Sequence, residues 1–180
     1  MTDIEAGVVR MGGPLDPRDG WSAEPCSIAN ALAVVTTRSA FLILREAFYG
    51  TVRFDDFVAR VEISEQVAAA RLRELVDHGL LEREPYRDPG QRTRHRYRLS
   101  AKGSDLFPVL VALMQWGDRW RDDAGGPVAL THHDCGAPVG VELRCARGHP
   151  VVPGDLVLSL TPAGRARLDA TATPNGEPDD

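Results

Sequence analysis

Four side chains of the segment SEQVAAARLRELVDHG have the types and the spacing that recognition of DNA bases requires. On a helical wheel of about 100° per residue, Gln66, Ala69, Ala70 and Arg73 share one side of the predicted helix. Glutamine can pair with adenine and arginine with guanine in the major groove, and the two alanines leave room for close approach. A merely solvated helix face has a similar composition, so the neighbouring elements must decide between the two interpretations.

The opposite side of the same helix is apolar and must pack against other parts of the fold. It is formed by Val67, Ala68, Leu72 and Leu75. Arg71 falls among them, where a long side chain can bury its stem while a nearby carboxylate or carbonyl holds its charge. The alternative, that Arg71 is itself a DNA ligand, rests on its charge alone.

A second group of basic residues lies in a predicted β-hairpin over residues 82–99, which turns at RDPGQRT. In its second strand Arg94, Arg96 and Arg98 alternate with other residue types and therefore point to one face. A row of guanidinium groups on a protruding hairpin suits phosphates or the minor groove, although charge on an edge strand also prevents aggregation. The predicted DNA contacts are Ser64, Gln66, Ala69, Ala70, Arg73, Arg92, Arg94 and Arg96.

Cysteine and histidine cluster in the segment 127–162. The pairs His132-x-x-Cys135 and Cys145-x-x-x-His149 have ligand types and spacings compatible with a tetrahedral zinc ion, which would be structural. A metal-free hairpin is the alternative, and no other cofactor is expected.

Cys26 follows a proline near a predicted helix start, where the helix macrodipole can stabilise a thiolate. A buried thiol that packs as a small apolar side chain is the alternative. A cysteine nucleophile would need a partnered histidine, and His78 and His95 belong to the segments already assigned to DNA contact. No catalytic residues are expected, and the protein is not expected to be an enzyme.

The composition of the 180-residue chain is that of an ordinary globular protein, with 43% apolar and 26% charged residues. No apolar run approaches the ~18 residues of a membrane-spanning helix, and the N-terminus lacks a signal-peptide pattern, so we expect a cytoplasmic protein without membrane contact. The net charge of −5 is unevenly distributed, since residues 38–102 contain 13 basic and 10 acidic residues. A basic segment in an acidic chain indicates one face for an anionic partner.

Apolar periodicity and capping residues predict the elements that position these side chains. Ser39, Ser64 and Ser100 are the predicted N-caps. Gly79 ends the helix that Ser64 begins, and Pro108 should kink or restart the helix that Ser100 begins. Helices are expected over 28–35, 39–49, 55–61, 65–78 and 101–120.

The segments outside these elements are expected to be less regular. Residues 1–24 predict a disordered or loosely draped arm, and residues 163–180 a flexible acidic tail. Between the winged part, residues 25–122, and this tail, the segment 127–162 contains the strand-like runs VGVEL and DLVLSL, which predict a small β-hairpin extension.

The order of helix, helix, capped helix, hairpin and helix is that of a winged helix-turn-helix, a mainly α fold of the α+β kind. The chain from Cys26 to Trp120 resembles the HxlR family of bacterial transcriptional regulators, which are relatives of the MarR-type winged helices. Members often carry a cysteine at the position of Cys26, and some use it to sense oxidants or quinones. The resemblance is carried by CSIANAL, RSAFLILREAFYGTVRFDDF, ISEQVAAARLRELVDHGLLER, Tyr86, RYRLSAKG and LVALMQWGD.

The resemblance implies a sequence-specific regulator that binds double-stranded DNA as a homodimer on an inverted repeat. The apolar stripes over residues 26–38 and 106–120 are expected to form the dimer interface. A small effector could bind between these helices and the winged domain, near Phe48, Trp116 and Trp120. The alternative is a protein–protein interaction module with a winged-helix scaffold and a metal ribbon, but docking gives no reason to align the hairpin arginines.

Overall fold

The computed structural model describes residues 9–15, 26–35, 37–87, 89–90, 92–121 and 125–172. The chain forms two compact units, Glu24–Val141 and the combination of Met1–Ala23 with Glu142–Asp180. This division differs from the expected one, because the two ends of the chain combine and the Cys/His segment 127–162 is split between the units. Parts of the predicted arm and tail, together with Pro25 before the first helix, lie outside the described ranges.

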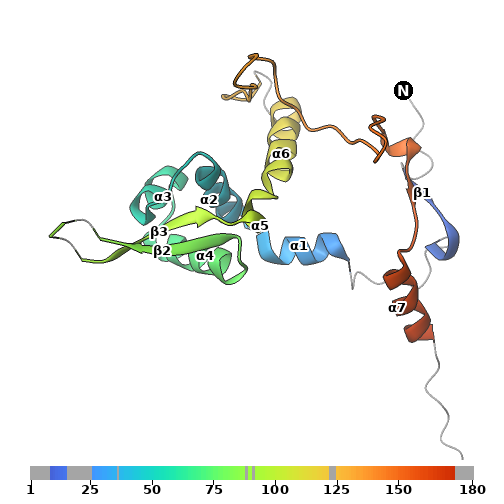
Figure 1. Cartoon of the computed structure of the whole chain (residues 1–180), viewed down its shortest axis with the longest axis horizontal. Coiled ribbons are helices and arrows are strands. Elements are labelled where there is room, and N and C mark those ends of the chain that lie inside the picture. Colours follow the sequence, from blue (N-terminus) through green and yellow to red (C-terminus); the bar gives the residue numbers. More distant parts are fainter. Residues whose placement is uncertain are drawn as a thin grey trace, which may run out of the picture. The chain divides into compact units, whose positions relative to one another are not determined.

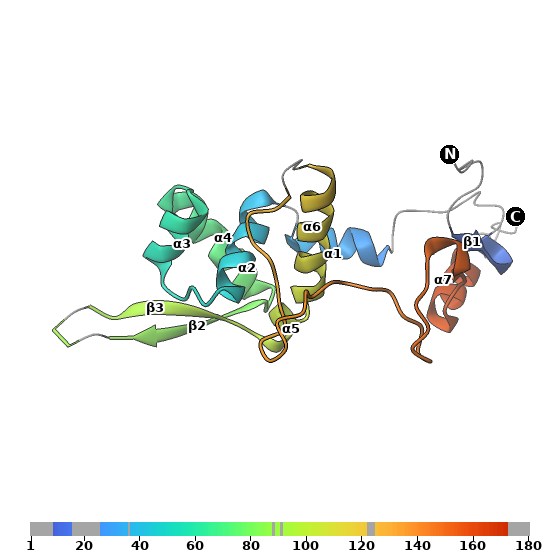
Figure 2. The same ribbon diagram turned by 90° about the horizontal axis from the view of Figure 1, so that it is seen from above.

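The larger unit is a winged helix-turn-helix. Its helices α2, α3 and α4 pack on one another, and the hairpin β2–β3 packs against α4 and α2. Figures 1 and 2 show the hairpin protruding beyond these helices. The elements are α1 (Ser27–Val35), α2 (Arg38–Phe48), α3 (Phe54–Val61), α4 (Glu65–Asp77), β2 (Leu81–Tyr86), β3 (Arg94–Leu99), α5 (Ala101–Ser104) and α6 (Phe107–Trp120).

Side-chain caps fix where three of these helices begin. Ser64 and Ser100 are confirmed as the caps of α4 and α5, since each hydroxyl accepts a hydrogen bond from the backbone N–H three residues on. The cap of α2 is Thr37 rather than the predicted Ser39, and its hydroxyl accepts from the Ala40 N–H at 3.1 Å. The start of α2 therefore lies slightly earlier than expected.

The core of this unit lies between α2, α3, α4 and the hairpin. Burial of one large apolar side chain contributes about 1.5–3 kcal/mol, so the buried side of α4 anchors that helix firmly. Fully buried side chains of this core include Ile43, Leu44, Phe57, Leu72, Leu75 and Leu81.

No single helix in the described ranges is long and apolar enough to cross a membrane. By length and composition α1 and α2 pass such a test only as a pair, bent by 80° at the break between them. The buried residues of α2 belong to the core, which accounts for its apolar composition.

A third extended segment joins the hairpin at the edge of β3. The Tyr97 N–H donates to the Val52 carbonyl at 2.8 Å, and Arg53 forms a bridge with Arg96. The residues that lead into α3 are therefore part of the same small sheet as the wing.

The end of α4 is joined closely to the start of α5. The Ser100 N–H donates to the Leu80 carbonyl at 3.1 Å, and the Lys102 ammonium donates to the His78 carbonyl at 2.7 Å. A Cβ atom at Gly103 would collide with the Leu80 carbonyl oxygen, so this close approach requires glycine. Beyond α5 the chain starts a fresh helix, α6, with Pro108 in its first turn, which is the second of the two outcomes predicted for this proline.

The smaller unit brings the two ends of the chain together. Its elements are β1 (Arg10–Met11), the 3₁₀ turns η1 (Gly13–Leu15) and η2 (Pro153–Asp155), β4 (Val157–Leu158) and α7 (Pro162–Ala172). β1 pairs in parallel with β4, and the side chain of Leu15 is buried. Where the sequence predicts an arm and a tail, residues 9–15 contain β1 and η1, and residues 162–172 form α7. A pairing between the two ends of the chain leaves no signal in local sequence patterns.

The Cys/His segment also differs from its expected form. VGVEL, residues 139–143, makes no strand, and DLVLSL contributes only β4, which pairs with β1. Isolated bridges instead join Thr131 to Pro138 and Arg144 to Pro150. Proline lacks the N–H that a continuing ladder needs, so two short turns replace the predicted hairpin.

Candidate nucleic-acid interface

The exposed side of α4 carries the residues predicted to read bases. Gln66 and Arg73 are exposed, and Ala69 and Ala70 between them are half-buried. The described residues offer Arg73 no hydrogen-bonded or ionic partner, so its guanidinium donors remain available to a ligand. α4 thus presents a narrow polar face to solvent, while its opposite side is buried in the core.

Two residues assigned to the packed side of α4 differ from their expected surroundings. Val67 is 39% exposed, whereas Ala68 beside it is fully buried. Arg71 is half-buried and forms an ion pair with Glu74, which is itself exposed. A carboxylate does hold the Arg71 charge, but this partner is in solvent rather than in the core.

The register of the hairpin confirms that Arg94, Arg96 and Arg98 share one face, since directly paired residues point to the same side of a sheet. The residues opposite them are Tyr86, Glu84 and Glu82 respectively.

Glu84 neutralises the part of the hairpin nearest the core. Its carboxylate accepts a hydrogen bond from Arg96 Nε at 2.7 Å and a longer one from Arg98 Nε at 3.3 Å. The hydrogen bond from Arg96, aided by the charges of both guanidiniums, holds the pKa of Glu84 below its usual value. Sequence analysis missed this residue, since its role depends on the cross-strand register.

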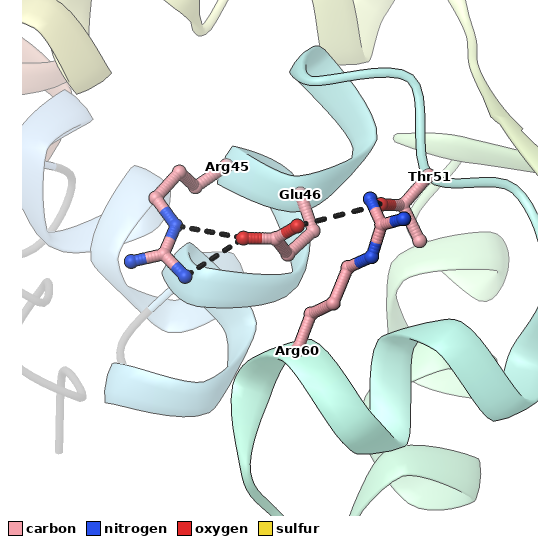
Figure 3. A network of polar contacts seen from close by, with 4 residues as sticks. All are labelled: Arg45, Glu46, Thr51 and Arg60. Atoms are coloured by element: carbon pink, nitrogen blue, oxygen red, sulfur yellow. Dashed lines mark hydrogen bonds and ion pairs between the residues drawn. The ribbon is translucent and has the colours of Figure 1, made fainter. Parts of the chain in front are cut away.

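A buried carboxylate behind the interface ties α2 to the start of the wing sheet (Figure 3). Glu46 is only 6% exposed and accepts from both Nε and Nη2 of Arg45, at 3.1 and 2.8 Å. Its second oxygen accepts from the Thr51 hydroxyl at 3.3 Å, and Arg60 of α3 donates to that hydroxyl at 3.0 Å. These bonds fix the residues immediately before Val52, which pairs with the wing.

A family model decides the family of the chain. The model, described as HxlR-like helix-turn-helix, matches residues 34–124, just over half of the sequence. The chain belongs to the HxlR-like helix-turn-helix family. The match spans α2 to α6 and includes both basic surfaces, so the resemblance carried by the sequence motifs is confirmed.

Relatives of this HxlR-like protein extend the likeness beyond the winged domain. The HTH-type transcriptional regulator Rv3095 of Mycobacterium tuberculosis is 38% identical over 144 residues, which cover 79% of this chain and 90% of the relative. The crystal structure of PA1607, assigned as a transcription factor, matches with a TM-score of 0.68 and 35% identity over 76% of this chain and 95% of its own. PA1374 of Pseudomonas aeruginosa matches with a TM-score of 0.58, 35% identity, and coverage of 79% and 99%. The protein is thus an HTH-type transcriptional regulator.

The residues predicted for an effector pocket lie on α2 and α6 of the HxlR-like domain. Phe48 stacks on Phe107, with ring centroids 4.9 Å apart. Trp116 and Trp120 on α6 are 58% and 63% exposed in the single chain. The extension meets α6 at Gln115, whose side chain bonds to the backbone of residues 139 and 141, and leaves both tryptophans uncovered. An effector pocket around these three residues stays a prediction.

Cys26 lies half-buried immediately before α1, and its carbonyl accepts from the Asn30 N–H at 2.9 Å. This is the expected position at a helix start. Both interpretations of its thiol, as a sensor and as a packing residue, stay open.

The predicted zinc ligands form two local pairs. His132 Nδ1 and Cys135 Sγ lie 3.4 Å apart, and the Cys145 N–H donates to the His149 carbonyl at 3.0 Å. The two pairs belong to different compact units. Among the residues that the structure describes, no group of three or more Cys, His, Asp or Glu side chains could hold a metal ion, so the zinc site stays a prediction.

Proposed function

We propose that this HTH-type regulator binds double-stranded DNA as a homodimer, with α4 in the major groove and the hairpin along the backbone. The observation that carries the proposal is the exposed Gln66–Arg73 face of α4, whose opposite side is buried and whose arginine has no partner among the described residues. Such a face has the width and the hydrogen-bonding groups that a major groove about 12 Å wide accepts.

Apolar side chains on α1 and α6 support the homodimer. On α1, Ile28 is 71% exposed and Leu32 is also exposed, although both belong to an apolar stripe. On α6 the exposed apolar residues are Phe107, Val109, Leu113, Trp116 and Trp120. A soluble chain rarely leaves this much apolar surface in water, and a twofold axis through these helices would cover it with an identical surface. Two copies of α4 would then meet two half-sites of an inverted repeat about one helical turn apart.

Footprinting on the DNA upstream of the protein's own gene tests the proposal directly. We expect a protected region with two similar half-sites and loss of protection with Arg73→Ala. Light scattering at micromolar concentration should give twice the mass of the chain. A monomer would contradict the dimer. If the protein shows no salt-sensitive binding to DNA, the protein–protein interaction module is favoured instead.

Regulation by a small effector or by oxidation at Cys26 is the second part of the proposal. The position of Cys26 beside α1 supports it, because oxidation there would act on a helix that we assign to the dimer interface. Diamide or quinone treatment should change the DNA affinity of the wild type and leave Cys26→Ser unaffected. Equal affinities with and without oxidant in both proteins would assign Cys26 to packing.

A further inference from the structure

A groove opens between the outer half of the hairpin and the start of α3. It has a volume of about 340 Å³, and its lining includes Arg53, Asp55, Tyr86 and Arg94. The base-reading face of α4 contributes nothing to this lining. The groove is therefore a second concave feature of the winged domain, with two guanidinium groups in its wall.

Arg53 is held in this groove by an aromatic ring rather than by a carboxylate. Its guanidinium carbon lies 5.4 Å from the centroid of the Tyr86 ring. Its backbone is fixed by the bridge to Arg96, so the side chain starts from a rigid sheet. In the described part of the chain Arg53 has no acidic partner. Stacking on a ring orients a guanidinium and leaves its N–H donors free for an anion.

Arg94 is the second cation of the groove, and it is directly paired with Tyr86 across the hairpin. Its carboxylate contact is long, with 3.4 Å between Arg94 Nη1 and Asp55 Oδ2, and both side chains are exposed. Exposed ion pairs of this kind are weak, so a doubly hydrogen-bonded phosphate can replace Asp55 at little cost.

The remaining arginines of the same hairpin face are occupied. Glu84 binds both Arg96 and Arg98, as described above. Of the three β3 arginines on this face, only Arg94 is left outside the Glu84 cluster, and it lies with Arg53 at the groove.

We propose that this groove holds one backbone phosphate of the DNA, outside the base contacts of α4. Arg53 and Arg94 donate to the phosphate oxygens, Tyr86 orients Arg53, and Asp55 is the group that the phosphate displaces. This inference rests on the proposed DNA binding and adds Arg53, Tyr86 and Asp55 to the interface. Because a phosphate carries no base identity, the groove strengthens binding to every sequence and sets the position of the protein on the duplex.

A salt titration of binding to a random-sequence duplex, followed by fluorescence anisotropy, tests the groove. Arg53→Gln and Arg94→Gln should each lower the slope of log K against log salt by up to about one unit, the value for the one phosphate that the two arginines share. Arg98→Gln is the matched control, since it removes the same charge from the same hairpin face but from a pair with Glu84, and its slope should equal that of the wild type. Arg53→Lys, which keeps the charge, should keep the wild-type slope.

Stability and affinity together separate a contact from a folding defect. Tyr86→Leu removes the ring and no charge, so it should weaken binding while the slope is kept. Thermal melts identify any variant that is not folded. If one is not, the salt slopes of the Arg53→Lys and Arg94→Gln proteins test the groove in its place. A wild-type protein that binds and is weakened by Arg73→Ala, beside Arg53→Gln and Arg94→Gln proteins with wild-type slopes, would overturn the groove and leave the proposed function standing. A wild type that fails to bind DNA would overturn the proposed function itself. Equal losses of slope in Arg98→Gln and Arg53→Gln would show that only total charge matters, which also overturns the groove.

Discussion

The two basic surfaces of the winged domain hold their charges in different ways. On α4 a single exposed arginine, Arg73, has no carboxylate partner within the described ranges, and the opposite side of this helix is buried in the core. On the hairpin three arginines share a face, but Glu84 binds two of them. The number of arginines is therefore a poor measure of how many phosphates or bases a surface can contact. What counts is which guanidiniums lack an internal partner.

The largest expected effect comes from removing the scaffold of α4. Leu72 is fully buried beneath the exposed face, so Leu72→Ala should lower the free energy of unfolding by about 2–5 kcal/mol. Urea denaturation followed by circular dichroism measures this loss. A smaller loss would show that the apolar side of α4 does not anchor the helix. The α4 surface would then be no more firmly held than the hairpin surface.

Arg73→Ala should weaken binding to the specific site by about 1–3 kcal/mol, because one base or phosphate contact in the major groove is lost. The fold should be unaffected, since Arg73 is exposed and has no hydrogen-bonded or ionic partner among the described residues. Binding isotherms on the footprinted sequence and a thermal melt give the two values. Normal affinity in this variant would remove α4 from the interface.

Arg71→Ala is the matched variant on the same helix, two positions earlier. Its exposed ion pair with Glu74 contributes about 0.2–1 kcal/mol, and the loss of stem packing adds a similar small amount, so stability should fall only slightly. A buried partner would have made the loss much larger. DNA affinity should remain that of the wild type, and a stable Arg71→Ala protein without DNA binding would reverse the assignment of the two sides.

Glu84→Gln tests whether Glu84 keeps the hairpin arginines from contacting DNA. It should release Arg96 and Arg98 for phosphates, so binding to random duplex should strengthen and its salt slope should steepen by about one unit. Anisotropy titrations at several salt concentrations measure both quantities, with Glu82→Gln as the control that removes a neighbouring carboxylate. Equal effects of the two substitutions would show that Glu84 acts only through its negative charge and not through its ion pairs with Arg96 and Arg98.

The smallest expected effect is on the titration of Glu84 itself. Its pKa lies below the usual value of 4.5, mainly because Arg96 donates a hydrogen bond to it, so NMR titration should find the Glu84 carboxylate still largely ionised at pH 4.5. The lowered pKa means that the ion pairs stabilise the hairpin above pH 4.5 and that this contribution is lost as the pH falls through the lowered pKa. Arg96→Gln should return the pKa further toward its usual value than Arg98→Gln does.

Local patterns predicted most of the winged domain. Ser64 and Ser100 cap their helices, Pro108 begins a new helix, and the alternation in β3 places its arginines on one face. The same patterns could propose Gln66 and Arg73, because a helix face follows from a period of 3.6 residues.

Features that depend on residues distant in the sequence could not be predicted from local sequence patterns. The ion pairs of Glu84 depend on the register of two strands, and the stacking of Arg53 on Tyr86 depends on the isolated bridge that joins Arg53 to β3. The pairing of β1 with β4 joins the two ends of the chain, which no local window contains. For that reason the Cys/His segment, whose β4 pairs with a strand near the N-terminus, differed most from its expected form.

The joint between α4 and α5 has a mechanical consequence. Hydrogen bonds from Ser100 and Lys102 hold Leu80 and His78, which directly follow α4, and the backbone of Gly103 contacts Leu80 without an intervening side chain. Two helices joined this tightly are expected to move as one rigid unit. A small rotation of α5 would therefore also rotate α4, and in the proposed dimer it would change the distance between the two α4 helices.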